Sequence, residues 1–347
     1  MRAALWLGVD RVETADVGIP ELEPGWALVK VAFTGLCGTD LAIYHGQHPR
    51  ATPPLIMGHE LSGTVVATAT ATANANDSIA IGDLVAAEPL ISCGECWACT
   101  HGHPHVCRRL GLYGIDAPGG LAEYVALPAD RLHVLPPGVS PRLAALVEPL
   151  AVAVHSVENS GLRPGDTVAV FGAGPIGMLT ALVARHEGAR QMLVTDPNPW
   201  RRGIAEQLGF TVVPEGETMT ATVRTLTDDE GADVTFDTAG HPSVAAEVAD
   251  ATRVLGTIVV VAVYKHPAEV DLRHVNFSEQ RMQGVRVYTT ADVRRAVELV
   301  SDDRLGLEKL PVRVFGLDDV PAAFEAARTG DHNLKVLVSP SGEGVTE

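Results

Sequence analysis

The sequence predicts an α/β protein in which a doubly wound parallel-sheet domain is inserted into a β-rich domain. The 347 residues are enough for about two domains. Residues 1–66 alternate between short β-like runs and turns, whereas apolar strands and helices alternate from Asp166 onward. The chain ends on a strand that no helix follows, and a lone strand needs a sheet to join. We therefore place the first domain at residues 1–150 and 290–347 and the second at residues 151–289.

In the N-terminal region, strands are predicted where apolar and β-branched residues cluster between turn residues. These strands cover residues 27–33, 61–66, 81–86 and 122–127. Residues 67–78 are rich in Ala, Thr and Asn, and we expect them to form an extended hairpin tip or a mobile loop. Residues 142–160 follow with apolar residues at helical spacing, which predicts a helix.

In the second region, largely apolar strands are separated by helices, which is typical of a parallel sheet covered on both faces. The expected strands are 167–171, 191–195, 210–213, 233–237, 257–263 and 285–288. The expected helices are 175–187, 200–208 and 243–254. Two amphipathic helices, 291–300 and 320–327, and the final strand 334–338 complete the chain. We expect this last strand to join the N-terminal sheet.

The charge of the chain excludes several classes of partner. The formal net charge is -17 and the sequence pI is about 5.1. Because no basic run could displace counterions from phosphate, we expect binding neither to nucleic acid nor to an acidic membrane. No apolar run is long enough to span a bilayer, and the N-terminus lacks the pattern of a signal peptide. A cytoplasmic location is therefore expected.

Four of the 5 cysteines form a tight cluster. The spacing of Cys93, Cys96, Cys99 and Cys107 allows four thiolates to converge on one zinc ion. Such a closed site leaves no position for a substrate, so its role would be structural. An iron–sulfur cluster and a disulfide framework are the alternatives, although clustered cysteines in a reducing cytoplasm are more often metal ligands.

The fifth cysteine, Cys37, indicates a second and different metal site. It lies at the end of a predicted strand, and His59 and Glu60 follow a segment with two prolines. One thiolate, one imidazole and one carboxylate would form an open zinc site with room for a substrate oxygen or water. Taken singly, each residue is more often an ordinary core or surface group.

Two further carboxylates could belong to the open site. Asp40 could accept a hydrogen bond from the second ring nitrogen of His59 and fix its tautomer, or it could be a turn or cap residue. Glu148 could be a metal ligand, directly or by exchange with water, or it could be a charge that the dipole favours at a helix start. The sequence leaves these alternatives open.

A glycine-rich segment predicts a dinucleotide site. Gly172, Gly174 and Gly177 follow a predicted strand, enclose Pro175 and Ile176, and open a predicted helix. Glycines in this strand–turn–helix context permit the tight turn and the close approach of a pyrophosphate to a helix N-terminus.

The next strand ends at an acidic residue that bears on the choice of cofactor. Asp196 lies near the offset of about 20 residues expected for the acid that binds the ribose hydroxyls. This acid favours NAD over NADP because it repels a 2′-phosphate. Arg201 and Arg202 weaken the inference, since an arginine could neutralise such a phosphate; they could equally lie on the solvent face of a helix.

Together these residues resemble the zinc-containing medium-chain dehydrogenase/reductase family over nearly the whole chain. The motifs that carry the resemblance are Gly35-Leu-Cys-Gly-Thr-Asp40, Gly58-His-Glu60, the four-cysteine cluster, Glu148-Pro-Leu-Ala-Val152, Gly172–Gly177 and Lys335-Val-Leu-Val338. Within the family the chain is similar to the polyol branch of sorbitol, butanediol and threonine dehydrogenases. The resemblance implies a GroES-like catalytic domain, a Rossmann NAD domain, a cleft between them, and a homodimer or homotetramer.

The resemblance also implies roles for single residues. Cys37, His59 and Glu60 would hold a catalytic zinc ion. Glu148 would be the exchangeable acid, and the hydroxyl of Thr39 would accept the substrate proton and pass it outward.

One position departs from the pattern of the family. Many relatives have a histidine two positions after the aspartate of the Cys-Gly-x-Asp motif, but this chain has Ala42 there. His45 could take over the outer part of the proton relay, alone or together with the cofactor ribose, or it could be an exposed loop histidine.

The sequence thus predicts an oxidoreductase that transfers a hydride between NAD and a small polyol, sugar or secondary alcohol, with a ketone as the oxidised product. The expected cofactors are NAD and two zinc ions per chain, one catalytic and one structural. A threonine-type amino-alcohol dehydrogenase is the alternative among enzymes. A catalytically inactive scaffold that binds zinc and NAD is the alternative outside them, but the intact set of Cys37, Thr39, His59 and Glu60 argues against it.

Overall fold

The computed structural model describes residues 1–69, 79–330 and 332–345, which form two compact units. Unit 1 comprises Met1–Glu148 and Thr289–Glu347, and unit 2 comprises Pro149–Tyr288. Most of the predicted hairpin tip, residues 70–78, lies outside the described residues.

A seven-stranded sheet forms the centre of unit 1, with the strand order β10-β6-β5-β3-β18-β17 and β9 paired with β3. Its strands are β3 (Trp26–Gly35), β5 (Glu60–Thr68), β6 (Leu84–Ala87), β9 (Tyr124–Pro128), β10 (Leu132–Val134), β17 (Val312–Gly316) and β18 (Lys335–Ser339). The strand predicted over 81–86 starts only at Leu84, because Ile81 and Gly82 form a turn in which Gly82 has φ +99°.

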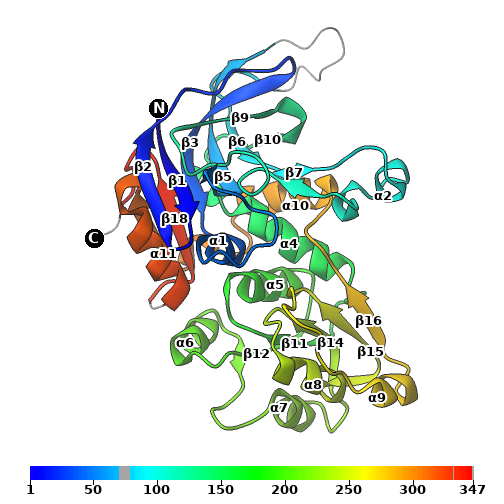
Figure 1. Ribbon diagram of the computed structural model, residues 1–347. Helices are drawn as coiled ribbons and strands as arrows, with labels where there is room; N and C mark the ends of the chain where they lie inside the picture. Colours follow the sequence, from blue (N-terminus) through cyan, green and yellow to red (C-terminus); the bar gives the residue numbers. More distant parts are fainter. Residues whose placement is uncertain (70–78, 331, 346–347) are drawn as a thin grey trace. The chain divides into compact units, whose positions relative to one another are not determined.

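The C-terminal strand completes this sheet. β18 pairs antiparallel with β3, so that Leu337 lies opposite Gly35 and Val338 opposite Thr34. On its other side β18 pairs in parallel with β17. The prediction that the last strand joins the N-terminal sheet is thereby confirmed (Figure 1).

Smaller elements surround the main sheet of unit 1. A three-stranded sheet contains β1 (Arg2–Gly8), β2 (Arg11–Asp16) and β4 (Leu55–Ile56), and β7 (Leu90–Ile91) pairs with β8 (Gly111–Leu112). The helices are α1 (Gly38–Tyr44), α2 (Trp97–Thr100), α3 (Pro141–Ala144), α10 (Thr290–Ser301) and α11 (Val320–Thr329), and short 3₁₀ turns lie at Pro104–Val106, Ala129–Arg131, Leu307–Lys309 and Leu317–Asp319. The single helix predicted over 142–160 is wrong: a turn at residues 145–146 separates α3 from α4 (Val147–Glu158).

Unit 2 contains a six-stranded sheet in the order β13-β12-β11-β14-β15-β16, and all its neighbouring strands are parallel. The strands are β11 (Thr167–Phe171), β12 (Gln191–Thr195), β13 (Thr211–Val212), β14 (Ala232–Asp237), β15 (Thr252–Val260) and β16 (Arg281–Gly284). The helices are α5 (Pro175–His186), α6 (Pro199–Gln207), α7 (Met219–Leu226), α8 (Pro242–Ala251) and α9 (Leu272–Phe277). This is the predicted doubly wound parallel sheet.

Two predictions within unit 2 are wrong. The helix predicted over 243–254 ends at Ala251, because Thr252 begins β15; its hydroxyl donates to the carbonyl of Val248 and lies 2.7 Å from Oγ1 of Thr235. The strand predicted over 285–288 is irregular, since Val287 has φ +45°, a left-handed conformation that ends extended pairing. The sheet ends one segment earlier, at β16.

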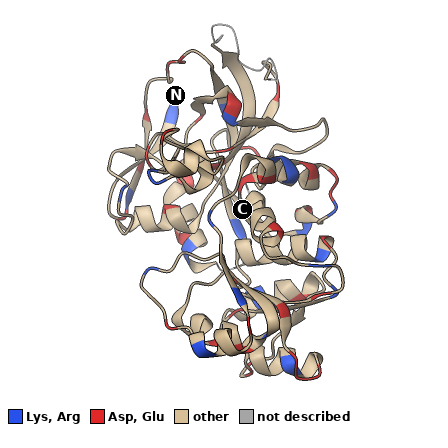
Figure 2. Ribbon diagram, turned by 90° about the vertical axis from the view of Figure 1, so that its right-hand side faces the viewer, with Lys and Arg blue, Asp and Glu red and all other residues tan. Residues whose placement is uncertain are grey.

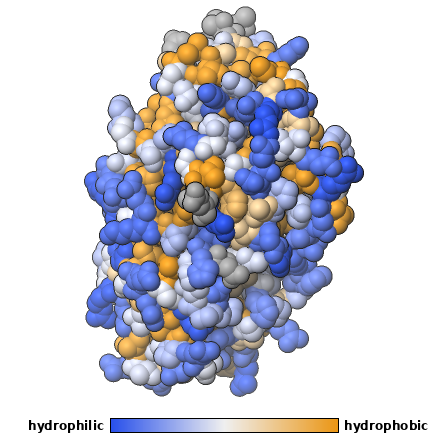
Figure 3. Space-filling model, turned by 90° about the vertical axis from the view of Figure 1, so that its left-hand side faces the viewer, coloured by the Kyte–Doolittle hydropathy of each residue, from blue (hydrophilic) through white to orange (hydrophobic). Residues whose placement is uncertain are grey.

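Each unit has an apolar core of its own. One core of unit 1 includes Trp6, Ile43, Met57 and Phe324, whereas the core of unit 2 includes Phe171. Along the ribbon, Lys and Arg are interspersed with Asp and Glu (Figure 2). On the face drawn in Figure 3, apolar residues are interspersed with hydrophilic ones. No helix in the part of the chain that the structure describes is long and apolar enough to cross a membrane.

Candidate active site

Cys37, His59 and Glu60, which we call the open metal cluster, come together in unit 1. Each offers one ligand atom, and these atoms all lie within 4.8 Å of one another. The register of the main sheet explains the contact: Gly35 at the end of β3 lies opposite Glu60 at the start of β5. Cys37 follows Gly35 by two residues as the N-cap of α1. Residues separated in sequence thus meet at one edge of the sheet.

Asp40 caps α1 and lies beside the ring of His59. Its carboxylate accepts from the backbone N–H of Cys37 at 2.9 Å, which completes a capping box at the start of α1, and from the N–H of Gly58 at 3.3 Å. Its Oδ1 also lies 3.6 Å from Nδ1 of His59. Burial favours a raised pKa for Asp40, but His59 and the Cys37 N–H outweigh it and the pKa is lowered. Asp40 therefore remains an anion that faces the imidazole.

His59 shows that the open cluster fits a metal cation. Burial opposes the charged ring, yet Asp40 and Cys37 hold the pKa of His59 well above its usual value. Among the described residues, its Nδ1 is one of the buried atoms without a hydrogen-bond partner. A cation held by the ring and the Cys37 thiolate would take the place of the proton in this negatively charged setting. Thiolate, imidazole and carboxylate are ligands that zinc prefers, and three of them leave a position open.

Lys335 is a part of this site that the sequence did not reveal. Its ammonium forms an ion pair with Glu60 and donates to the carbonyl of Leu36 at 3.0 Å. Burial favours a lowered pKa for Lys335, but Glu60, Cys37 and Glu148 outweigh it, so the pKa is raised. Lys335 therefore stays charged and offers Glu60 a partner other than a metal. The sequence signals were a lysine at the start of an otherwise apolar strand and its place in the motif Lys335-Val-Leu-Val338, and neither indicated contact with Glu60.

Replacing Lys335 with methionine should destabilise metal-depleted protein by about 3–5 kcal/mol, because Glu60 would remain buried without a cation. Zinc in the open cluster should reduce this loss. The double variant Glu60→Gln/Lys335→Met should regain most of the stability, since no buried charge is left unpaired. Denaturant unfolding with and without chelator measures both effects. If metal-depleted Lys335→Met were as stable as metal-depleted wild type, the ion pair between Lys335 and Glu60 would be contradicted.

The structure places two other predicted residues near the open cluster. Thr39 lies in the first turn of α1, with its Oγ1 3.9 Å from Sγ of Cys37. Glu148 lies in the first turn of α4, is 7% exposed, and contributes to the raised pKa of Lys335. Glu148 thus lies at a helix start, and its charge also acts on Lys335 beside the open metal cluster.

His45 has a different environment. It is the C-cap of α1, and its Nδ1 lies 2.5 Å from Oδ1 of Asp10. Ala42, the position that departs from the expected pattern, accepts from the backbone N–H of Gln47 at 2.7 Å through its carbonyl. The role of His45 in a proton relay stays a prediction.

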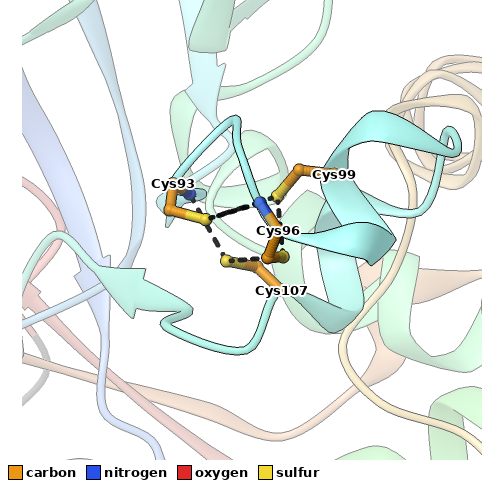
Figure 4. Close-up of side chains that lie close together, drawn as sticks. All are labelled: Cys93, Cys96, Cys99 and Cys107. Carbon is orange, nitrogen blue, oxygen red and sulfur yellow. Dashed lines mark hydrogen bonds between the residues drawn. The ribbon is translucent and has the colours of Figure 1, made fainter.

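The side chains of the four-cysteine cluster point toward one another (Figure 4). Sγ of Cys96 lies 3.5 Å from Sγ of Cys99 and 3.9 Å from Sγ of Cys107. Four thiolates at about 2.3 Å from one tetrahedral zinc ion would be separated by about 3.8 Å. All these cysteines are free, so no disulfide framework forms. The geometry therefore fits the predicted closed zinc site.

The thiols of this cluster differ in their pKa values, and therefore in how readily they become the thiolates that bind a metal. The backbone N–H groups of Glu95 and Cys96 lower the pKa of Cys93 to about 6. Burial and the neighbouring sulfurs raise the pKa of Cys99 to about 12. Four thiolates would thus need a cation to offset their mutual repulsion.

The glycine-rich segment of unit 2 has the tight turn that a dinucleotide site requires. Gly172 follows β11 with φ +105°, and a side chain at Gly177 would collide with the carbonyl oxygen of Gly172. Gly174 is the N-cap of α5, and Pro175 is its first residue. The N-terminus of α5 is therefore left without a side-chain cap.

Asp196 supports this glycine turn directly. Its Oδ2 accepts from the backbone N–H of Ala173 at 2.8 Å, and its Oδ1 accepts from Asn198 N–H at 2.8 Å. Arg201 Nη1 lies 3.7 Å from the same carboxylate, whereas Arg202 donates to the carbonyl of Asp196 at 2.9 Å. Gly172, Gly174, Asp196 and both arginines line a cavity of about 810 Å³ within unit 2.

Comparison with known proteins identifies families for both units. The family described as alcohol dehydrogenase GroES-like domain matches residues 23–137, and the family described as zinc-binding dehydrogenase matches residues 175–302. The chain is 35% identical to a 2-dehydro-3-deoxy-L-galactonate 5-dehydrogenase of Pseudoalteromonas atlantica, over 99% of this chain and 100% of the relative. It is 34% identical to the L-threonine 3-dehydrogenase of Bacillus subtilis, over 93% and 94% of the two chains. A Sinorhizobium meliloti crystal structure bound to NADP is similar with a TM-score of 0.90 and 33% identity, over 98% of this chain and 99% of that one.

Proposed function

The chain belongs to the zinc-containing medium-chain dehydrogenase/reductase family, and from this we propose that it oxidises a secondary alcohol of a polyol or sugar-type substrate to a ketone with NAD. As a member of this family it is a zinc-dependent, nicotinamide-dependent dehydrogenase. The observation that carries the proposal is the open metal cluster, because its three ligands leave room for the oxygen of a substrate.

When bound, zinc supplies a Lewis acid that lowers the pKa of a hydroxyl, and the nicotinamide supplies the hydride acceptor. Cys37, His59 and Glu60 would hold the zinc, and the anionic Asp40 would orient the ring of His59. Glu148 would be an additional, exchangeable acid.

The hydroxyl of Thr39 would accept the proton that leaves the substrate. Its position beside Cys37 supports this role, since a proton acceptor must lie within reach of the reacting group. Among the chain's own residues, His45 would be the candidate to pass this proton outward. Cys93, Cys96, Cys99 and Cys107 would hold the structural zinc.

The activity is tested with purified, zinc-loaded protein, NAD and a panel of sugars, cyclitols, diols, sugar acids and L-threonine. We expect the NADH absorbance band to appear with a polyol or sugar acid and to be larger than with L-threonine. Faster turnover of L-threonine would favour the amino-alcohol alternative, for which the relative from Bacillus subtilis is the reason. NADH binding without turnover of any alcohol would favour the scaffold.

Asp196 should set a preference for NAD. Replacing it with alanine should reduce kcat/KM for NAD by about tenfold to a hundredfold, because hydrogen bonds to a charged group are worth about 1.5–3 kcal/mol. The kcat/KM for NADP should fall less, because NADP binding would lose only the support that Asp196 gives the glycine turn through Ala173. Initial rates with both cofactors measure the ratio. A wild-type preference for NADP would instead assign the decisive role to Arg201.

We also propose that the protein acts in the cytoplasm as a homodimer or homotetramer. A reducing cytoplasm would keep all the cysteines available for zinc. An oligomer is supported by β16, an edge strand of unit 2 whose residues are all exposed. Met282 of β16 is an exposed apolar side chain, and the preceding elements β15 and α9 add exposed Leu255 and Phe277. An edge of this kind favours pairing with another chain.

The assembly is tested by light scattering during size-exclusion chromatography. Wild type should elute as a dimer or tetramer, and Phe277→Asp/Met282→Asp should shift it towards a smaller species. A monomeric wild type at micromolar concentration would contradict the proposal.

A further inference from the structure

His48 lies in the segment after α1 and has no role in either metal cluster. Its ring is half-buried, and Nδ1 accepts from the backbone N–H groups of Arg50 at 3.4 Å and Ala51 at 3.2 Å. A ring nitrogen that accepts hydrogen bonds carries no proton. In the neutral ring the proton is therefore on Nε2, so His48 presents an N–H donor of fixed tautomer.

The segment that carries His48 is attached to the open metal cluster. Nε and Nη2 of Arg50 donate to the two carboxylate oxygens of Asp116 at 2.9 and 3.0 Å. Gly114 and Gly119, on either side of Asp116, pack so closely on the carbonyl of Gly58 that neither has space for a side chain. Gly58 precedes His59 directly. The bidentate ion pair thus fixes the segment of His48 against the backbone that positions the metal ligand His59.

The charges of the cluster act on His48. Burial and Arg50 lower the pKa of His48, Asp116 and Asp40 oppose this, and His59 adds to the lowering. The ring is therefore neutral at neutral pH and lies within electrostatic reach of Asp40 and His59. His45 differs, since its partner is Asp10 and its charge acts on Glu325 of α11.

We propose that His48 is a substrate-recognition residue whose Nε2–H donates a hydrogen bond to a second oxygen of the substrate, next to the alcohol that is oxidised. This inference rests on the proposed function and narrows its substrate class. An N–H donor binds a hydroxyl or carboxylate oxygen but not an ammonium group. His48 would therefore favour polyols and hydroxy acids over simple alcohols.

His48 is not suited to be the proton acceptor of the reaction. Protonation at Nδ1 would break both hydrogen bonds from Arg50 and Ala51, and Nε2 already carries a proton. Its contribution should therefore appear in substrate selection.

The experiment compares butane-2,3-diol, 3-hydroxybutyrate and butan-2-ol with NAD. His48→Ala should reduce kcat/KM for the diol or the hydroxy acid by about tenfold to a hundredfold, because a site built to donate to an oxygen discriminates against its absence. The value for butan-2-ol should change by less than about threefold. The substrate with the larger loss identifies the acceptor as hydroxyl or carboxylate.

Two further variants distinguish recognition of the substrate by His48 from a structural role of His48 in its own segment. His48→Gln keeps a terminal N–H donor and should recover part of the loss, whereas His48→Asn, with a shorter side chain, should not. His186→Ala at the end of α5 is the control for the loss of a histidine and should match wild type. Zinc content and NADH affinity should be unchanged in every variant.

An equal loss for all three substrates, or no loss for any, would overturn the role of His48 while leaving the proposed function intact. A wild type that oxidises no alcohol in the panel, despite full zinc and NADH binding, would overturn both.

Discussion

Replacing Cys37 with serine should remove the metal from the open cluster and reduce turnover by about a thousandfold or more. Zinc chemistry is worth several kcal/mol at the transition state, and each 1.36 kcal/mol corresponds to about tenfold in rate. NADH should still bind, because the glycine turn and Asp196 lie in unit 2 and are untouched. Elemental analysis, turnover and NADH fluorescence measure the three effects separately.

The matched control is Cys107→Ser in the four-cysteine cluster. It should release the other zinc ion and lower the melting temperature, because a closed site holds its part of the fold together. Mild chelation of wild type should remove the metal of the open cluster first, since only three side chains hold it, and activity should be lost while the fold persists. Fully active protein with one metal or none would refute the assignment of two zinc ions.

Zinc binding at the open cluster should also weaken as the pH falls. The pKa of His59 is raised in the metal-free protein, so a proton must leave before the ring can bind a metal. Zinc titrations at several pH values would show this. An affinity that is independent of pH below neutrality would contradict the protonated ring.

The parts of the fold that the sequence predicted well depend on local signals. β11 and β12 agree with the predicted ranges residue for residue, because turns with glycine or aspartate bound both apolar runs. The four cysteines lie within one short segment, so their spacing alone indicated convergence. The open cluster needed more: we predicted it from Cys37, His59 and Glu60 taken together, and the resemblance to a known family implied the same three ligands.

The parts that the sequence did not predict depend mostly on contacts between residues that lie far apart in the sequence. Lys335 reaches Glu60 only because β18 pairs with β3, and nothing near either residue in the sequence indicates the other. His48 is one of 13 histidines, and its segment is related to the metal cluster by a contact between residues far apart in the sequence, Arg50 and Asp116. The strand expected over 285–288 failed for a local reason that composition does not show, the left-handed conformation of Val287.

Replacing Thr39 with alanine should reduce the rate of alcohol oxidation by about a hundredfold to ten-thousandfold, the range for a lost acid–base group. Zinc content and NADH binding should persist, because Cys37 keeps its thiolate and alanine is well tolerated in the first turn of α1. Thr39→Ser retains the hydroxyl and should keep much of the rate. Turnover with the best substrate of the panel measures both variants.

The pH dependence of Thr39→Ala distinguishes a proton acceptor from a residue that only packs beside Cys37. Without the hydroxyl, the proton must leave to solvent, and hydroxide becomes a better acceptor as the pH rises. The deficit of the alanine variant relative to wild type should therefore shrink at high pH. A packing defect would leave the deficit constant and would reduce the rate of Thr39→Ser as well. Near-normal oxidation by Thr39→Ala at neutral pH would show that another group carries the proton, and His45 would then be the next residue to replace.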